Sequence, residues 1–229
     1  MNAELRIRYR FDLPDGSQKA LDFTFNPTDF RMTNAPPAEP PFWTELKFNQ
    51  CANCPLSGPE HTHCPAALQM AAALEPLKAL VSFDTVGVSV QQSVRTVYAE
   101  TSAQQAMSSV LGLIMATAGC PWTDRLRPMA RFHLPFASES ETLYRSISMY
   151  LLSREIAPTD GSTFAALEDL YKNLHFVNRD MSRRLGAATH TDPARNAIAL
   201  LDSYTTLLPA ALERSLEELT PLFDAWKIK

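Results

Sequence analysis

The chain has 229 residues, a net charge of −4, a hydrophobic fraction of 45% and a charged fraction of 20%, which suits one large or two small globular domains. The acidic balance argues against a nucleic-acid-binding surface, which needs a basic excess. No apolar run approaches the roughly 20 residues of a membrane span, and the N-terminus does not resemble a signal peptide. We therefore expect a cytoplasmic protein that binds neither nucleic acid nor membrane.

Alternating segments in the first hundred residues predict a small antiparallel sheet. Residues 4–12 alternate arginine with apolar side chains, a Pro-Asp-Gly turn stands at 14–16, and residues 21–25 alternate again, which predicts a β-hairpin. Residues 45–48 predict a short strand that leads into the first cysteine. Residues 86–98 predict one further strand, with an interruption by a bulge as an alternative.

Apolar positions at helical spacing predict helices over most of the remaining chain. A capping box of Ser138 and Glu141 marks one helix start, and Gly119 marks one helix end. Another expected helix begins at Pro65 and ends near Pro76. Two more run from 102 to 117 and from 164 to 185, and the last starts at Asp192 and is interrupted at Pro209 and Pro221. The expected fold class is α+β, with a small antiparallel sheet and helices followed by a helical, bundle-like C-terminal half.

The pattern divides the chain into two regions. Residues 1–157 form an α+β region that contains the cysteine motif, and residues 158–229 form a helical region. The boundary is weak, and one continuous domain remains an alternative. The apolar stripes of the second region predict core packing or a surface for a protein partner or a homodimer, and its His175 and His190 are isolated from other candidate ligands.

The chain contains four cysteines: Cys51, Cys54, Cys64 and Cys120. A Cys-x₂-Cys pair on a tight turn can direct two sulfurs at one ion, which is why the spacing recurs in zinc and cluster sites. Because stable disulfides are rare in the cytosol, we interpret all four as ligands of one metal centre. The alternative is that they are buried apolar cysteines.

Prolines follow three of these cysteines. Pro65 and Pro121 suit the first position of a helix, so Cys64 and Cys120 are predicted N-cap residues. At that position free N–H groups and the helix dipole stabilise a thiolate. This arrangement supports their role as ligands.

The identity of the metal is less clear from the sequence. Cysteine followed by proline and a remote fourth cysteine are typical of iron–sulfur sites, so we favour an iron–sulfur cluster slightly over zinc. His61 and His63 stand beside Cys64, and either could complete a Cys₃His zinc site. Solvated loop histidines are the simpler interpretation of both.

Three arginines and a histidine follow Cys120 within residues 124–133. Arg127, Arg131 and His133 are therefore candidates for contacts with the cofactor, where they would hold an anion or tune a cluster by hydrogen bonds. Ordinary surface ion pairs are the alternative explanation.

Some segments resemble a known family. The cysteine-proline loop, HTHCP at 61–65 and the run GCPWTDRLRPMARFHLPFASESETLYRSISMYLL from 119 resemble a family of uncharacterised bacterial proteins, a domain of unknown function. The resemblance covers about the first two-thirds of the chain. It implies a bacterial cytosolic protein that shares the cysteine and RFHLPF motifs, and it implies no activity.

These observations favour a metal-binding regulatory or interaction protein that responds to redox state or iron. A small iron–sulfur redox enzyme and a zinc-stabilised protein-binding module are the alternatives. The sequence contains no phosphate loop, dinucleotide fingerprint, nucleophile elbow or HExxH motif, so it leaves open whether the protein is an enzyme.

Overall fold

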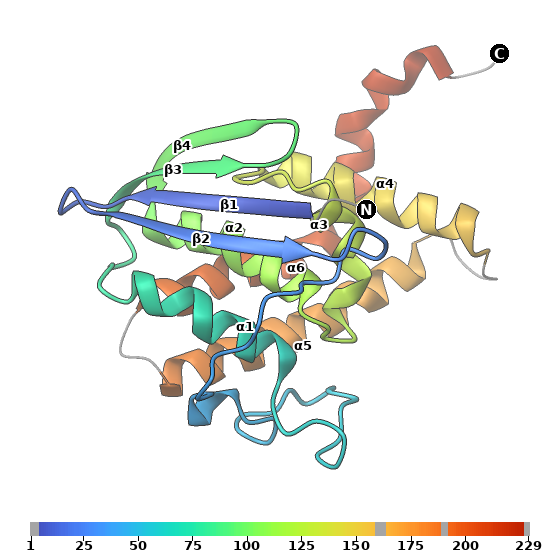
Figure 1. Ribbon diagram of the computed structural model, residues 1–229. Helices are drawn as coiled ribbons and strands as arrows, with labels where there is room; N and C mark the ends of the chain where they lie inside the picture. The colour runs from blue at the N-terminus through green and yellow to red at the C-terminus, as the bar shows by residue number, and fades with distance from the viewer. Residues whose placement is uncertain (1–4, 159–163, 189–191, 227–229) are drawn as a thin grey trace.

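A computed structural model describes residues 5–158, 164–188 and 192–226. Its sheet has four antiparallel strands in the order β2-β1-β3-β4 (Figure 1). The strands are β1 (Leu5–Asp12), β2 (Gln18–Phe25), β3 (Thr85–Gln91) and β4 (Thr96–Ser102). The expected α+β class is confirmed, as is the N-terminal hairpin, although residue 4 lies outside the described part.

The two faces of the sheet differ as the period of two requires. Ile7, Tyr9 and Phe11 of β1 are buried. Arg6 and Arg8 point to the other face, where both form ion pairs with Asp22 on β2. These exposed pairs add little stability, so burial of the apolar face is the main force that fixes the sheet.

The helices gather against the apolar face of the sheet and beyond it (Figure 1). Their bounds are α1 Pro65–Leu74, α2 Ala103–Thr117, α3 Arg127–Arg131, α4 Glu139–Ile156, α5 Ala165–Ala188 and α6 Asp192–Leu219, with 3₁₀ helices η1 Phe42–Thr44, η2 Glu75–Leu77, η3 Thr123–Leu126 and η4 Thr220–Trp226.

Helix α2 is the central helix of the molecule. Its Ser109 hydroxyl is 2.9 Å from the Tyr9 hydroxyl on β1. A methyl group at Gly112, farther along α2, would lie 3.5 Å from Leu201 on α6. Helix α2 therefore separates the sheet from α6, which explains why it is apolar around most of its circumference.

The main hydrophobic core crosses the predicted boundary between the two regions. It joins the sheet, α1 and α2 to residues of α5 and α6, among them Val177, Met181 and Ile198. A second cluster links α4 to α5 through residues such as Ile147 and Leu170. The division at 157 and 158 itself stays a prediction. No helix in the described ranges has the length and apolar character needed to cross a membrane.

Several local expectations were right. Helix α1 ends before Pro76. Gly119 adopts a φ of +93° after α2, a conformation that favours glycine. The Ser138 side chain accepts from the Glu141 N–H, and the Glu141 carboxylate accepts from the Ser138 N–H, so the capping box is formed.

Three expectations about secondary structure were wrong. Residues 45–48 form turns, with one isolated bridge between Glu45 and His63. The buried Arg184 donates to the carbonyl groups of this segment, which a strand would use for its own hydrogen bonds. Residues 86–98 are two strands rather than one, since the Gln92 N–H bonds the Arg95 carbonyl at 2.8 Å and reverses the chain. Helix α6 continues across position 209, because a proline removes only one backbone donor.

Candidate functional site

The first two cysteines lie on a short loop that is closed on itself and attached to α5. The Cys54 N–H donates to the Cys51 carbonyl at 3.0 Å, as a tight turn requires. Between them, the Ala52 N–H donates to the Asp180 carboxylate of α5 at 2.9 Å. This bond holds the Cys-x₂-Cys turn against a regular helix rather than leaving it to the solvent.

The same loop is also attached to the segment that contains Cys120. The Asn53 side chain donates to the Asn173 carbonyl on α5 at 3.0 Å. The Trp122 indole N–H donates to the Asn53 carbonyl at 2.7 Å. Trp122 follows Cys120 by two residues, so this hydrogen bond brings the fourth cysteine towards the first two.

Cys64 is the N-cap residue of α1, as predicted, with Pro65 in the first turn. Its N–H donates to the Thr44 carbonyl at 2.8 Å. Burial raises the pKa of the Cys64 thiol, and the N–H groups of Ala67 and Ala66 at the helix start act in the opposite direction. The helix start therefore favours the thiolate, although burial dominates in the protein without a bound ion.

The prediction that Cys120 caps a helix was wrong. The next helical segment, η3, begins at Thr123, and its N-cap residue is Trp122. Pro121 stands in a turn between them, because the chain needs two residues to change direction after Gly119. The Asp124 N–H still donates to the Cys120 carbonyl at 2.9 Å, so Cys120 has a fixed backbone position.

The structure brings the other three thiols within electrostatic range of Cys51. The pKa of the Cys51 thiol is raised to about 12, chiefly by burial and then by the nearby groups Cys64, Cys120, Asp180 and Cys54. Each contribution from a neighbouring thiol arises because two thiolates in the same partly buried volume repel each other. A bound cation would remove this repulsion, because thiols give up their protons when they ligate a metal.

Arg184 is the important residue that sequence reasoning missed. It is 1% exposed and donates to the carbonyl groups of Trp43, Glu45 and Leu46. Its Nε is buried and has no partner in the described structure. Its charge also lowers the pKa of the Cys64 thiol.

A signal for Arg184 existed in the sequence. It lies seven residues after Val177 and three after Met181, so helical periodicity puts it on the buried face of α5. A lone arginine on an apolar stripe predicts a buried charge that needs an acceptor. Its position on that stripe could therefore have identified it.

The interactions described for His61 and His63 do not involve a thiol. His61 is exposed, and the His63 Nδ1 is 2.9 Å from the hydroxyl of its neighbour Thr62. Among the residues that the structure describes, no three His, Cys, Asp or Glu side chains are grouped closely enough to hold a single metal ion. His175 pairs with Asp202 on α6 at 2.9 Å, and His190 lies outside the described residues.

The interactions described for the three predicted cofactor contacts involve residues other than the cysteines. Arg127 forms ion pairs with Asp29 and Asp124. Arg131 lies over the ring of Phe30, with 5.5 Å between its Cζ atom and the ring centroid. None of the interactions described for these two arginines involves a cysteine, so their role at the centre stays a prediction.

His133 belongs to a separate cavity. Its Nε2 is 2.5 Å from the Tyr9 hydroxyl, and its ring lines a space between α2 and α4. The pKa of His133 is lowered to about 3, chiefly by burial and to a smaller extent by the charge of Arg145. The imidazole is therefore neutral at physiological pH. Its predicted role as a cofactor contact of the cysteine centre remains untested.

Comparisons with known proteins add one finding. Residues 7–224 match the sequence model of a family described as a domain of unknown function (DUF6901). The match extends well beyond the first two-thirds of the chain. Searches of curated proteins and of solved structures found no match.

Proposed function

Since the chain belongs to the DUF6901 family, a domain of unknown function, we propose a function from its own residues. We propose that Cys51, Cys54, Cys64 and Cys120 hold an iron–sulfur cluster. The protein would then be a cytoplasmic regulatory or interaction protein that responds to redox state or to iron.

The buried charge of Arg184 carries this proposal. A guanidinium that is 1% exposed loses most of its hydration, which costs several kcal/mol unless a negative charge compensates it. The carbonyl groups that it contacts satisfy donors but supply no net charge. Among the described residues, no carboxylate forms an ion pair with Arg184. A cluster bound to four thiolates is anionic. It would lie beside Cys64, whose pKa the charge of Arg184 already lowers.

The sequence pattern of the thiols favours a cluster slightly over a single zinc ion, because cysteine followed by proline and a remote fourth cysteine are typical of cluster sites. Zinc needs its sulfurs at about 2.3 Å from one point, whereas each cysteine of a cluster binds a different metal atom of a larger core. Cys64, Cys120 and Cys54 all act electrostatically on Cys51, which supports one shared centre.

The surroundings of the thiols would link the charge of the cluster to the protein. The Cys-x₂-Cys turn is bonded to α5 through Asp180, and α5 also contains Arg184. Reduction adds one negative charge to the cluster, which strengthens its attraction to Arg184 and its repulsion of Asp180. A change in redox state would therefore alter the contact between this loop and α5.

The proposal is tested on anaerobically purified full-length protein. We expect a brown protein with a broad absorption band near roughly 400 nm, the region of thiolate-bound iron, and matching amounts of iron and acid-labile sulfide. Cys120→Ser should lower metal content and thermal stability together, because a bound metal contributes to folding. His63→Ala is the matched control and should change neither.

Other outcomes would replace the proposal. A colourless protein with one zinc that is lost in Cys120→Ser would identify a zinc-stabilised binding module. Metal loss in His63→Ala with normal content in Cys120→Ser would identify a Cys₃His site. Protein with no metal after anaerobic reconstitution would overturn the metal centre itself.

We also propose that the C-terminal helices mediate association with a second copy of the chain. Leu152 and Ile156 of α4 and Leu222 and Trp226 of η4 are exposed apolar side chains, and apolar patches on a surface favour association. Sedimentation of the wild type and of Trp226→Ser tests this. A monomeric wild type at all concentrations would rule it out.

A further inference from the structure

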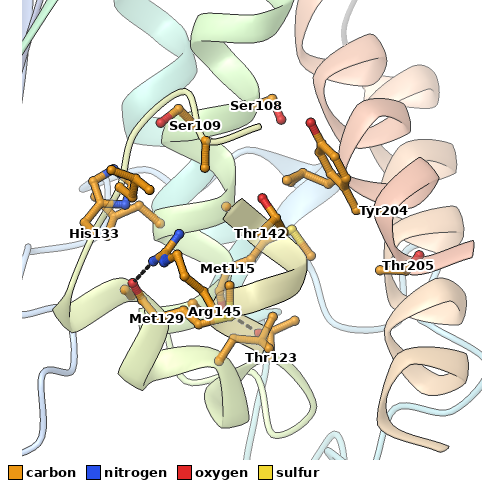
Figure 2. Close-up of a pocket in the computed structure, with 18 of the residues that line it drawn as sticks. Ser108, Ser109, Met115, Thr123, Met129, His133, Thr142, Arg145, Tyr204 and Thr205 are labelled. Carbon is orange, nitrogen blue, oxygen red and sulfur yellow. Dashed lines mark hydrogen bonds between the residues drawn. The ribbon is translucent and has the colours of Figure 1, made fainter. Parts of the chain in front are cut away.

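A cavity lies between α2, α4, α5 and α6, away from the cysteine loop. Its volume is about 190 Å³. Figure 2 shows His133 and Ser109 on one side of it and Tyr204 and Thr205 on the other, with the Arg145 side chain between them. The lining is otherwise mostly apolar, with Leu113 and Leu201 among its members.

Arg145 provides the positive charge of the cavity. One of its terminal nitrogens, Nη2, donates to the Met129 carbonyl at 2.6 Å and to the Phe132 carbonyl at 3.1 Å. These bonds hold the guanidinium in place from one side. Its Nε and Nη1 have no hydrogen bond to any described residue, so two donor groups remain for a ligand.

The charge of Arg145 has no ion-pair partner among the described residues. Glu141 is the acid that acts on it electrostatically. The Glu141 carboxylate, however, accepts from the N–H and hydroxyl of Ser138 in the capping box. Burial also lowers the pKa of the Arg145 guanidinium, which shows that the site already bears part of the cost of removing a cation from water.

The neighbouring polar groups are fixed and uncharged. The Tyr9 hydroxyl contacts both the His133 Nε2 and the Ser109 hydroxyl, so these three side chains satisfy one another. Burial of the imidazole leaves it neutral. Among the described lining residues, Arg145 is therefore the single charged side chain.

We propose that this cavity binds a small monocarboxylic acid with an apolar body. The remaining donors of the guanidinium can form a charge-assisted hydrogen bond to a carboxylate, and one cation balances one negative charge. A phosphate would carry more charge than Arg145 alone can balance. An apolar cavity of about 150 Å³ holds benzene, so a volume of about 190 Å³ suits an acid of the size of benzoate or phenylacetate.

The test compares an acid with its neutral isostere on the full-length protein. Titration calorimetry with phenylacetate and with phenylacetamide measures how much of the affinity depends on the carboxylate. We expect phenylacetate to bind at least about tenfold more tightly, a typical factor for one charge-assisted contact in a partly buried site. Equal affinities, or no binding of phenylacetate at millimolar concentration, would overturn the proposal.

Two variants locate the binding site. Arg145→Met should abolish the preference for the acid, whereas Arg154→Met, a matched change on the same helix outside the cavity lining, should keep it. Gly112→Leu places a side chain in the cavity and should abolish binding of both compounds. Preference for the acid that survives Arg145→Met in a folded protein would show that binding occurs elsewhere. If Arg145→Met does not fold, the wild-type comparison and Gly112→Leu still decide. The test does not depend on the cysteine centre.

Discussion

Arg184 and Cys64 belong to elements far apart in the chain, yet the guanidinium of Arg184 acts on the Cys64 thiol. Burial raises the pKa of this thiol, and the charge of Arg184 lowers it, together with the N–H groups at the start of α1. The arginine thus favours the thiolate form that a metal requires. Its donors at the same time fix residues 43–46, the segment that precedes the cysteine loop.

Arg184→Met should reduce both stability and metal content. Three carbonyl groups lose their donor, and the bonds to Trp43 and Leu46 are buried, so we expect the free energy of unfolding to fall by about 3 kcal/mol, as measured by urea unfolding. Arg183→Met is the neighbouring control, because the Arg183 side chain is 66% exposed, and should change stability little. If Arg184→Met keeps the iron content of the wild type, its charge does not balance the cluster.

The metal-free protein should lose stability in alkaline solution. The pKa of the Cys51 thiol rises from 9.0 to about 12 on folding, so the folded state holds this proton more tightly than the unfolded state. The contribution is complete below pH 9 and is lost as the pH rises towards 12. Thermal melts of apoprotein at increasing pH should show this decline, and Cys51→Ala should show a smaller one.

The buried Tyr171, whose pKa is raised to about 12, contributes in the same pH window, so only the difference between variant and wild type measures Cys51. The stability of the metal-loaded protein should depend less on pH, because metal-bound thiols have already lost their protons. Identical slopes for Cys51→Ala and the wild type would show that this thiol is not buried as described.

Acid should destabilise the protein through His133. The pKa of this imidazole falls from 6.5 to about 3 on folding, chiefly because of burial. Below pH 6.5 the unfolded state therefore binds the proton first, and stability is lost as the pH falls towards 3. His133→Gln retains a partner for the Tyr9 hydroxyl and cannot titrate, so its unfolding free energy should fall less between pH 6.5 and 4. If the unfolding free energy falls equally in His133→Gln and in the wild type, the loss of stability in acid does not come from His133.

Local sequence patterns predicted the parts of the fold that local forces decide. The N-terminal hairpin follows from strict alternation, the start of α4 from its capping box, and the position of Cys64 from the proline that follows it. Each of these features is encoded within a few neighbouring residues. The sequence could therefore indicate them without knowledge of the tertiary structure.

The missed features depend on residues far apart in the chain. The segment at 45–48 resembles a strand, but Arg184 binds its carbonyl groups from about 140 positions away and prevents a ladder. The contact between His133 and Tyr9, 124 positions apart in the chain, likewise has no local signal. Only tertiary packing determines which side of the chain such a residue faces.

Two substitutions of Asp180 can separate the effect of its charge on Cys51 from its role in attaching the cysteine loop to α5. Its side chain is 6% exposed, accepts from the Ala52 N–H and raises the pKa of the Cys51 thiol. Asp180→Asn removes the negative charge but keeps an oxygen acceptor for Ala52. Asp180→Ala removes both. Both variants therefore remove the negative charge, and only Asp180→Ala also removes the acceptor for the Ala52 N–H.

Both variants should ionise Cys51 more readily, because the repelling carboxylate is gone and Arg179, its ion-pair partner, is left unbalanced nearby. We expect alkylation of Cys51 in the apoprotein, followed by mass spectrometry at pH 8, to be severalfold faster in both. Asp180→Ala alone should also lose about 1 kcal/mol of stability, the typical net contribution of one hydrogen bond. Unchanged alkylation in Asp180→Asn would show that this charge does not act on the thiol. Equal stability of the two variants would show that the Ala52 bond does not hold the loop.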